Sequence, residues 1–130
     1  MSQVVVAARR TVLDEGGPGM GVDVVLYRVV EAGPGRRRLV PAEVLPDPDD
    51  VLLDLVERVR GTGRTPLLDR VDPVGQLVVP AGRAPQLLAE LACLAEVART
   101  TPEVTHVRRL DLLARHCRPE RDMEIRFEGD

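Results

Sequence analysis

The chain predicts an α+β fold, in which a mostly antiparallel sheet of about five or six strands carries about three helices packed on it. Two observations predict this class. Short β-branched runs bounded by Gly- and Pro-containing turns predict strands, and longer segments with apolar residues at helical spacing predict helices. At 130 residues the chain suits a single domain, residues 1–130, which buries roughly two-thirds of the surface that its unfolded form exposes.

The composition is that of a globular protein with an aliphatic core. Hydrophobic residues make up 44% of the chain and charged residues 30%, a mixture that does not resemble a disordered chain. Tyr27 and Phe127 are the only aromatic residues, and Trp is absent. The core must therefore be built from Leu, Val, Ala and Ile.

Runs of β-forming residues predict strands over residues 3–8, 22–30, 36–40, 67–71, 76–79 and 123–127. The run over 22–30 is apolar on both faces, which favours a central strand. Pro41 cannot donate a ladder hydrogen bond, so the strand over 36–40 ends there or lies at the sheet edge. Between the first two runs, the Gly-rich residues 16–21 predict a hairpin loop rather than a phosphate cradle, because no Gly-Lys-Ser/Thr ending and no helix follow.

The first expected helix follows Asp47, whose side chain can cap the free amides of the first turn. Its apolar residues recur on one stripe, and Gly61 ends it. On the opposite face Asp54 and Arg58 have the spacing of an intrahelical ion pair.

Two further helices are expected in the second half. One runs from about Pro85 to Arg99, with Gln86 and Glu90 facing away from its Leu-rich side. Thr100 or Thr101 is expected to cap the next. The apolar stripe of that helix comprises Val104, Val107, Leu110, Leu113, Ala114 and Cys117.

Histidine and cysteine offer little support for catalysis. His116 and Cys117 are adjacent, so on a helix their side chains diverge by about 100°, and His106 lies about 15 Å from His116 along the axis. With no HExxH or CxxC spacing, we interpret Cys117 as a core thiol and both histidines as surface or helix-end residues. Cys93 and Cys117 are expected to be free thiols in a reducing cytoplasm. No metal site and no cofactor is expected.

The charge pattern argues against nucleic acid and membrane as partners. The net charge is −3, and all 18 basic residues are Arg, interspersed with acidic residues. The one basic run, Arg36 to Arg38, is interpreted as a solvated hairpin edge. Neither a signal peptide nor an apolar run of the ~20 residues that span a bilayer is present, which favours a cytoplasmic protein.

The expected hairpin between residues 67–71 and 76–79 contains the candidate site. Asp72, Pro73 and Gly75 fit a type I turn, in which Asp72 accepts from the turn amides. Asp69 and Arg70 have no such local reason. Asp69, Arg70 and Asp72 are therefore the candidate binding residues, although a structural ion pair between Asp69 and Arg70, anchoring the hairpin, explains two of them without a ligand.

Four segments carry a resemblance to known sequences: PLLDRVDPVG, APQLLAELACL, LARHCR and the closing IRFEGD. Together they resemble a family of small stand-alone proteins of GC-rich bacteria, in which a DRVDPxG turn precedes a Leu-rich helix. The resemblance covers about the second half of the chain. No activity is attached to the family, so the resemblance implies a fold and assigns no catalytic residue.

These observations favour a small cytosolic, non-enzymatic factor that binds another protein, as an immunity or antitoxin-like factor or an accessory subunit. The alternative is a small-molecule-binding protein or enzyme with a carboxylate-based site near Asp69 and Asp72, to which Glu43 could contribute. A third possibility is a homodimer joined through a sheet edge or the Leu-rich helix.

Overall fold

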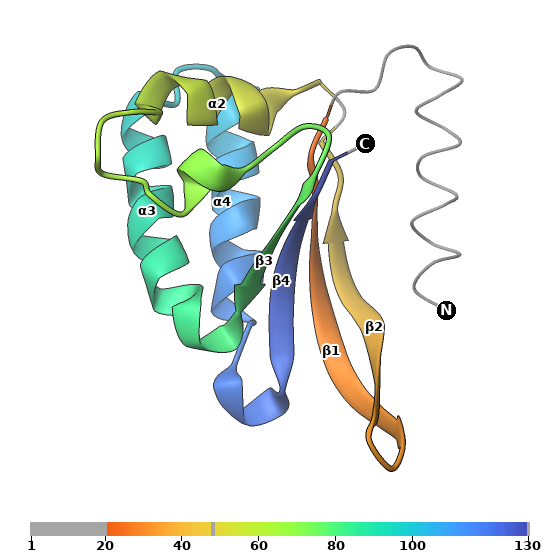
Figure 1. The fold of residues 1–130 in the computed structure, drawn as a ribbon. Helices are drawn as coiled ribbons and strands as arrows, with labels where there is room; N and C mark the ends of the chain where they lie inside the picture. The colour runs from red at the N-terminus through yellow and green to blue at the C-terminus, as the bar shows by residue number, and fades with distance from the viewer. Residues whose placement is uncertain (1–20, 48, 130) are drawn as a thin grey trace.

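The computed structural model describes residues 21–47 and 49–129 and has the predicted α+β fold (Figure 1). The strand expected over 3–8 and residues 16–20 of the Gly-rich loop lie outside the described residues. In chain order the described elements are β1 (Asp23–Gly33), β2 (Arg36–Leu45), α2 (Val51–Val59), the 3-10 helix η1 (Leu68–Arg70), β3 (Gln76–Pro80), the 3-10 helix η2 (Ala81–Arg83), α3 (Ala84–Val97), α4 (Thr101–Arg115), the 3-10 helix η3 (Pro119–Arg121) and β4 (Met123–Glu128).

The four described strands form one antiparallel sheet in the order β2-β1-β4-β3. The helices α2, α3 and α4 pack together on one face of it, as Figure 1 shows. The described part of the chain thus has four strands where five or six were expected. None of its helices is long and apolar enough to cross a membrane.

Strand β1 is central, as its two-sided apolar pattern predicts. It pairs with β2 on one side and β4 on the other, and Val24, Val25 and Leu26 are all fully buried. Strand β2 is an edge strand that continues past Pro41 to Leu45. Pro41 lies beside a register shift between Leu26 and Tyr27 of β1. An irregular position at the edge of the sheet tolerates proline, because no second neighbour among the described strands needs its missing N–H.

The prediction of a strand over residues 67–71 is wrong, and so is the prediction that it pairs with β3. Strand β3 pairs with β4 instead. Residues 68–70 form η1 instead. The Asp69 N–H donates to the Thr65 carbonyl oxygen at 2.8 Å, a helical rather than an extended hydrogen bond. Short apolar runs are ambiguous between helix and strand. Here the turn lets both Leu67 and Leu68 enter the core, whereas a strand would place them on opposite faces.

Glu90 explains why η1 is stable at this place. It was expected to face away from the buried side of its helix, but it is only 3% exposed. Its two carboxylate oxygens accept the N–H groups of Leu67 at 3.1 Å and Leu68 at 2.8 Å. A carboxylate on α3 thus caps the first turn of a segment that lies 22 residues earlier in the chain.

The predicted caps of α2 and α4 are confirmed. Asp47 accepts the Val51 N–H at 2.8 Å and the Leu52 N–H at 3.1 Å. Burial raises the pKa of Asp47 to about 6, although the amides it accepts from oppose that shift. At the start of α4, Thr100 and Glu103 form a reciprocal capping box.

The ion pair expected between Asp54 and Arg58 is wrong. Arg58 instead makes a two-pronged pair with Glu103 of α4, at 2.9 and 2.6 Å, and donates to the Val97 carbonyl oxygen at the end of α3. The hydrogen bonds from Arg58 are the main reason that the pKa of Glu103 falls to about 2. A contact between helices therefore replaces the local i,i+4 contact, and it satisfies both prongs of the guanidinium with one carboxylate.

Candidate functional site

The side chains of Asp69 and Asp72 are engaged in local structure. The Asp69 carboxylate accepts the Thr65 hydroxyl at 2.9 Å and the Gly61 N–H at 3.4 Å. Asp72 accepts the Val74 N–H at 2.9 Å, and its carbonyl oxygen accepts from Gly75, as the type I turn predicts. Both carboxylates therefore stabilise turns.

Arg70, the third candidate, is exposed on η1. Between the described residues no ion pair joins it to Asp69, so Asp69 anchors its turn through Thr65 and Gly61 instead. The structure brings Asp69 and Asp72 to the same loop region but does not join their carboxylates through a shared partner. The role of the three residues in binding stays a prediction.

The histidine and cysteine assignments hold except at one residue. Cys117 is a core thiol whose pKa burial raises to about 11, and Cys93 is also buried and free. His116 ends α4, is exposed and contacts the carboxylate of Glu43 through Nδ1. His106, expected at the surface, is only 7% exposed, and burial followed by the charge of Arg109 lowers its pKa. Its ring therefore stays neutral near pH 7.

Helical spacing was the signal for His106. It lies four and seven residues before Leu110 and Leu113, so it belongs to the buried stripe of α4. Among the described residues, no group of three or more His, Cys, Asp and Glu side chains could hold a metal ion.

A polar cluster on the sheet face away from the helices depends on strand order and has no signal in the sequence. The Tyr27 hydroxyl donates to the Glu128 carboxylate at 2.6 Å, and Gln76 donates to the same oxygen at 3.4 Å. The guanidinium of Arg126 lies 5.7 Å from the centre of the Tyr27 ring and donates to Glu124 at 2.5 Å. The cluster ties β1, β3 and β4 together.

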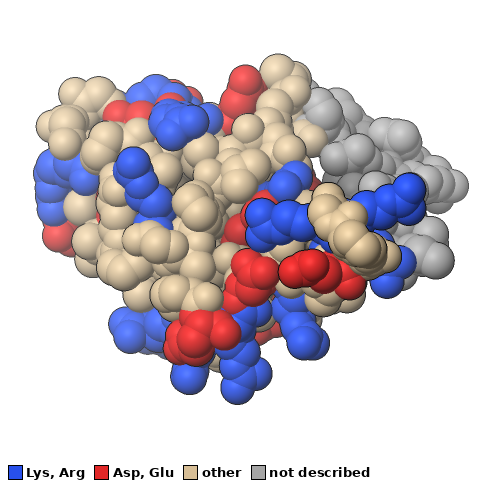
Figure 2. All heavy atoms as spheres, turned by 60° about the horizontal axis from the view of Figure 1, so that its bottom comes forward, with Lys and Arg blue, Asp and Glu red and all other residues tan. Residues whose placement is uncertain are grey.

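Figure 2 shows the end of the molecule at which the β1–β2 hairpin lies, with basic and acidic side chains interspersed over it. Arg36, Arg37 and Arg38 are exposed there, and Arg37 pairs with Asp122 at 3.4 Å. An exposed pair of this kind contributes little to stability. The mixed charges agree with the solvated hairpin edge that the sequence predicts.

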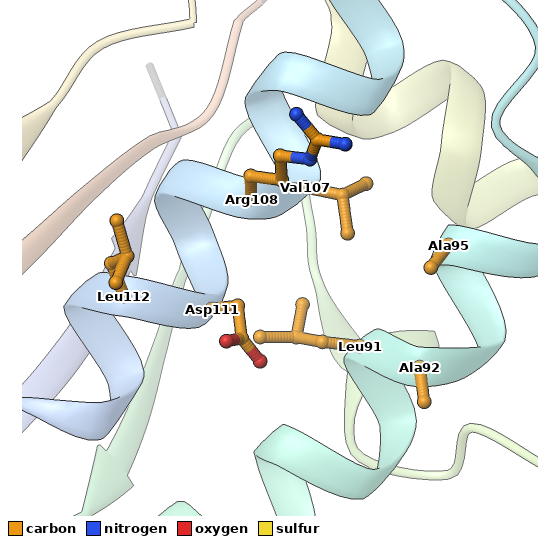
Figure 3. A pocket seen from close by; sticks show the side chains of 7 residues that line it. All are labelled: Leu91, Ala92, Ala95, Val107, Arg108, Asp111 and Leu112. Carbon is orange, nitrogen blue, oxygen red and sulfur yellow. The ribbon is translucent and has the colours of Figure 1, made fainter.

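The helical layer has an open hollow between α3 and α4, with a volume of about 380 Å³. Figure 3 shows its lining, with Leu91 and Asp111 pointing toward one another across it. The lining residues are Leu91, Ala92 and Ala95 on α3, and Val107, Arg108, Asp111 and Leu112 on α4. We call this feature the α3–α4 groove. It is mainly apolar, and Asp111, its one carboxylate, is paired with Arg115 at 2.6 Å.

A second hollow of about 250 Å³ lies between α4 and the end of β2. It is lined by Glu43, Val44, Leu45, Arg109, Leu112, Leu113 and His116. We call it the β2–α4 hollow. Leu112 lines both hollows and is 57% exposed, so it forms a ridge between them. Leu112 lies outside the predicted apolar stripe of α4. A leucine in that position is the feature of the sequence that could have indicated an exposed apolar surface on this helix.

Only two other large hydrophobic side chains in the described ranges are exposed, Val74 at 66% and Val78 at 41%. Val74 lies in the turn before β3 and Val78 on that edge strand, and neither lines the two hollows. The Leu112 ridge therefore combines an exposed aliphatic side chain with concave, mainly apolar surface, a combination that is typical of interaction sites.

Comparison of the chain with protein-family models, with curated proteins and with solved structures gives no significant match. The resemblance of the second half to small proteins of GC-rich bacteria stays a prediction.

Proposed function

We propose that this protein is a small cytosolic, non-enzymatic factor that binds another protein through the Leu112 ridge, as an immunity or antitoxin-like factor or an accessory subunit. The observation that carries the proposal is the position of Leu112. Its exposed side chain separates two hollows whose floors, Leu91, Val107 and Leu113, are buried core residues. A partner that covers the ridge removes this apolar surface from water at a gain of about 25 cal/mol per Å².

The contacts favour this proposal over a carboxylate-based enzyme. A general acid or base needs a free carboxyl group within reach of a substrate. The Asp69 carboxylate accepts hydrogen bonds from Thr65 and Gly61, and the Asp72 carboxylate accepts one from Val74. Glu43, the third carboxylate considered, contacts His116 at the edge of the β2–α4 hollow.

Site-directed photo-crosslinking in the native host tests the proposal. A photoreactive amino acid replaces Ala92 in the groove or, as a control position, Val74 in the turn. We expect one defined crosslinked species from position 92 and none from position 74. The purified partner and this protein should then form a binary complex in size-exclusion chromatography.

Leu112→Asp provides the matched perturbation, with Val74→Asp as the control for the same change at an exposed aliphatic residue. We expect Leu112→Asp to lower partner affinity at least about tenfold, which is the usual scale for a side chain at the centre of an interface. Equal affinity of the two variants, or crosslinks that do not depend on position, would count against the proposal.

A further inference from the structure

We infer that the partner segment that seats on the Leu112 ridge is an amphipathic helix with acidic residues along both borders of its apolar stripe. This inference rests on the proposed function and adds the chemistry of the partner. It follows from the shape of the two hollows and from the charges at their rims.

The shape favours a helix. Two concave apolar hollows of about 380 and 250 Å³ lie side by side with a single leucine between them. A helix laid across such a surface presents anchors at i, i+3 or i+4, and i+7, which can enter the two hollows on either side of a ridge. Ala92 and Ala95 on the α3 side carry only a methyl group, so a helix backbone can approach closely there.

The charges at the rim are unbalanced. Arg108 lines the α3–α4 groove and Arg109 lines the β2–α4 hollow, at four and three residues before Leu112. Neither arginine makes an ion pair with an acidic residue of the described ranges. The two carboxylates at these rims, Asp111 and Glu43, already contact Arg115 and His116. The ridge is therefore bordered by cationic groups on both sides.

A partner helix complements this surface when carboxylates border its apolar residues. Complementary charges around an apolar centre speed association and fix the orientation of the partner. The net charge of this chain is −3, so the cationic border is a local feature and not a consequence of overall charge.

The same charges argue against a second copy of this chain as the occupant. A two-fold symmetric interface brings identical patches together. Here it would place Arg108 and Arg109 of one copy near the same residues of the other, with both local carboxylates already engaged. The repulsion favours a different protein.

The test uses the full chain and two designed peptides of about 18 residues, a length at which helices can form in isolation. Both peptides carry the same Leu and Ala stripe; one is bordered by Glu and the other by Arg. Binding is measured by fluorescence anisotropy at low and high salt. We expect the Glu-bordered peptide to bind at least about tenfold more tightly at low salt, with a ratio that shrinks as salt rises.

Charge reversal then locates the effect. Both arginines are exposed, so Arg108→Glu/Arg109→Glu should keep the far-ultraviolet circular dichroism and melting temperature of the unmodified protein. We expect this double variant to prefer the Arg-bordered peptide. Arg70→Glu, the same change at an exposed arginine outside both hollows, should keep the original preference.

The outcomes separate this inference from the proposed function. Equal binding of both peptides, or binding of neither, overturns the inference, whereas a Leu112-dependent crosslink in the host would still support the proposed function. A concentration-dependent dimer that Leu112→Asp dissociates assigns the ridge to a second copy and overturns the inference. If Arg70→Glu alone lost the preference for the Glu-bordered peptide, the peptide site would lie at η1, and the inference would be overturned.

Discussion

Glu90 is the buried group whose removal should destabilise the fold most clearly. It is 3% exposed, and three N–H donors contact its carboxylate: the amides of Leu67 and Leu68 and the side chain of Gln86 at 2.9 Å. In Glu90→Gln, the side chain keeps its shape but has one acceptor oxygen in place of two. One of the two backbone amides then faces an NH₂ group and loses its partner.

The expected cost can be worked from these contacts. A hydrogen bond to a charged group contributes about 1.5–3 kcal/mol, and an unsatisfied buried N–H costs about 1–3 kcal/mol. Glu90→Gln weakens one charge-assisted bond and orphans one amide, so we expect a loss of about 2–4 kcal/mol in the free energy of unfolding. Against a total of about 5–15 kcal/mol for a domain, this is a large fraction.

Urea unfolding followed by circular dichroism is the suitable assay, because the chain has no Trp and only one Tyr as an intrinsic fluorophore. Glu96→Gln is the matched control: it lies six residues further along α3 and pairs with Arg64 at the surface. The control should unfold at the urea midpoint of the unmodified protein. A Glu90→Gln midpoint within error of the control would refute the argument that Glu90 holds η1.

Two further predictions concern buried residues, Asp47 just before α2 and Gly129 just after β4. The pKa of Asp47 is about 6 in the folded protein against an ordinary value of 3.8, so the folded state binds the proton of this carboxyl more tightly than the unfolded state. The contribution of Asp47 to stability is therefore present below about pH 4 and is lost as pH rises to about 6. We expect the difference in unfolding free energy between the unmodified protein and Asp47→Asn to decline across this pH window. Gly129→Ala places a Cβ 2.4 Å from the Pro73 carbonyl oxygen and displaces the hydrogen bond from the Gly129 N–H to the Gly75 carbonyl oxygen, so it should lower the free energy of unfolding by about 1–3 kcal/mol. Gly82 has open space around it, so the control Gly82→Ala should not lower the melting temperature.

The features that the sequence predicts correctly depend on residues close together in the chain. The cap of α4 needs only Thr100 and the amide three residues after it, and the cap of α2 needs only Asp47 and the amides just after it. The central place of β1 follows from its own two-sided apolar pattern. In each case the physical cause lies within one element and can be read along it.

The errors occur where a partner comes from elsewhere. Glu90 follows Gln86 by four residues and looks like part of a solvated helix face, but its carboxylate accepts hydrogen bonds from the backbone amides of Leu67 and Leu68. Arg58 looks like a partner for Asp54, but Glu103 of another helix offers both oxygens. The choice between these partners depends on how α3 packs against η1 and how α2 packs against α4, which the local pattern does not contain.

The stretch that looks most like a motif therefore has a structural role, which bears on where function lies. Asp69 and Asp72 hold their own turns, and the carbonyl oxygens of Asp72 and Pro73 lie so close to Gly129 that no larger residue fits there. Residues 65–75 thus connect α3, β3 and the end of β4. Packing and hydrogen bonding account for these side chains, so they give no independent support for a ligand.

Leu112, Arg108 and Arg109 are in the opposite position. None of them closes a turn, caps a helix or enters the core cluster, and their exposure leaves apolar and cationic surface in contact with water. Side chains that the fold does not require are the ones most free to serve recognition. We therefore place the candidate interaction surface at the ridge on α4, where the structure leaves surface that a partner would bury, and not at the Asp-rich turn to which the sequence draws attention.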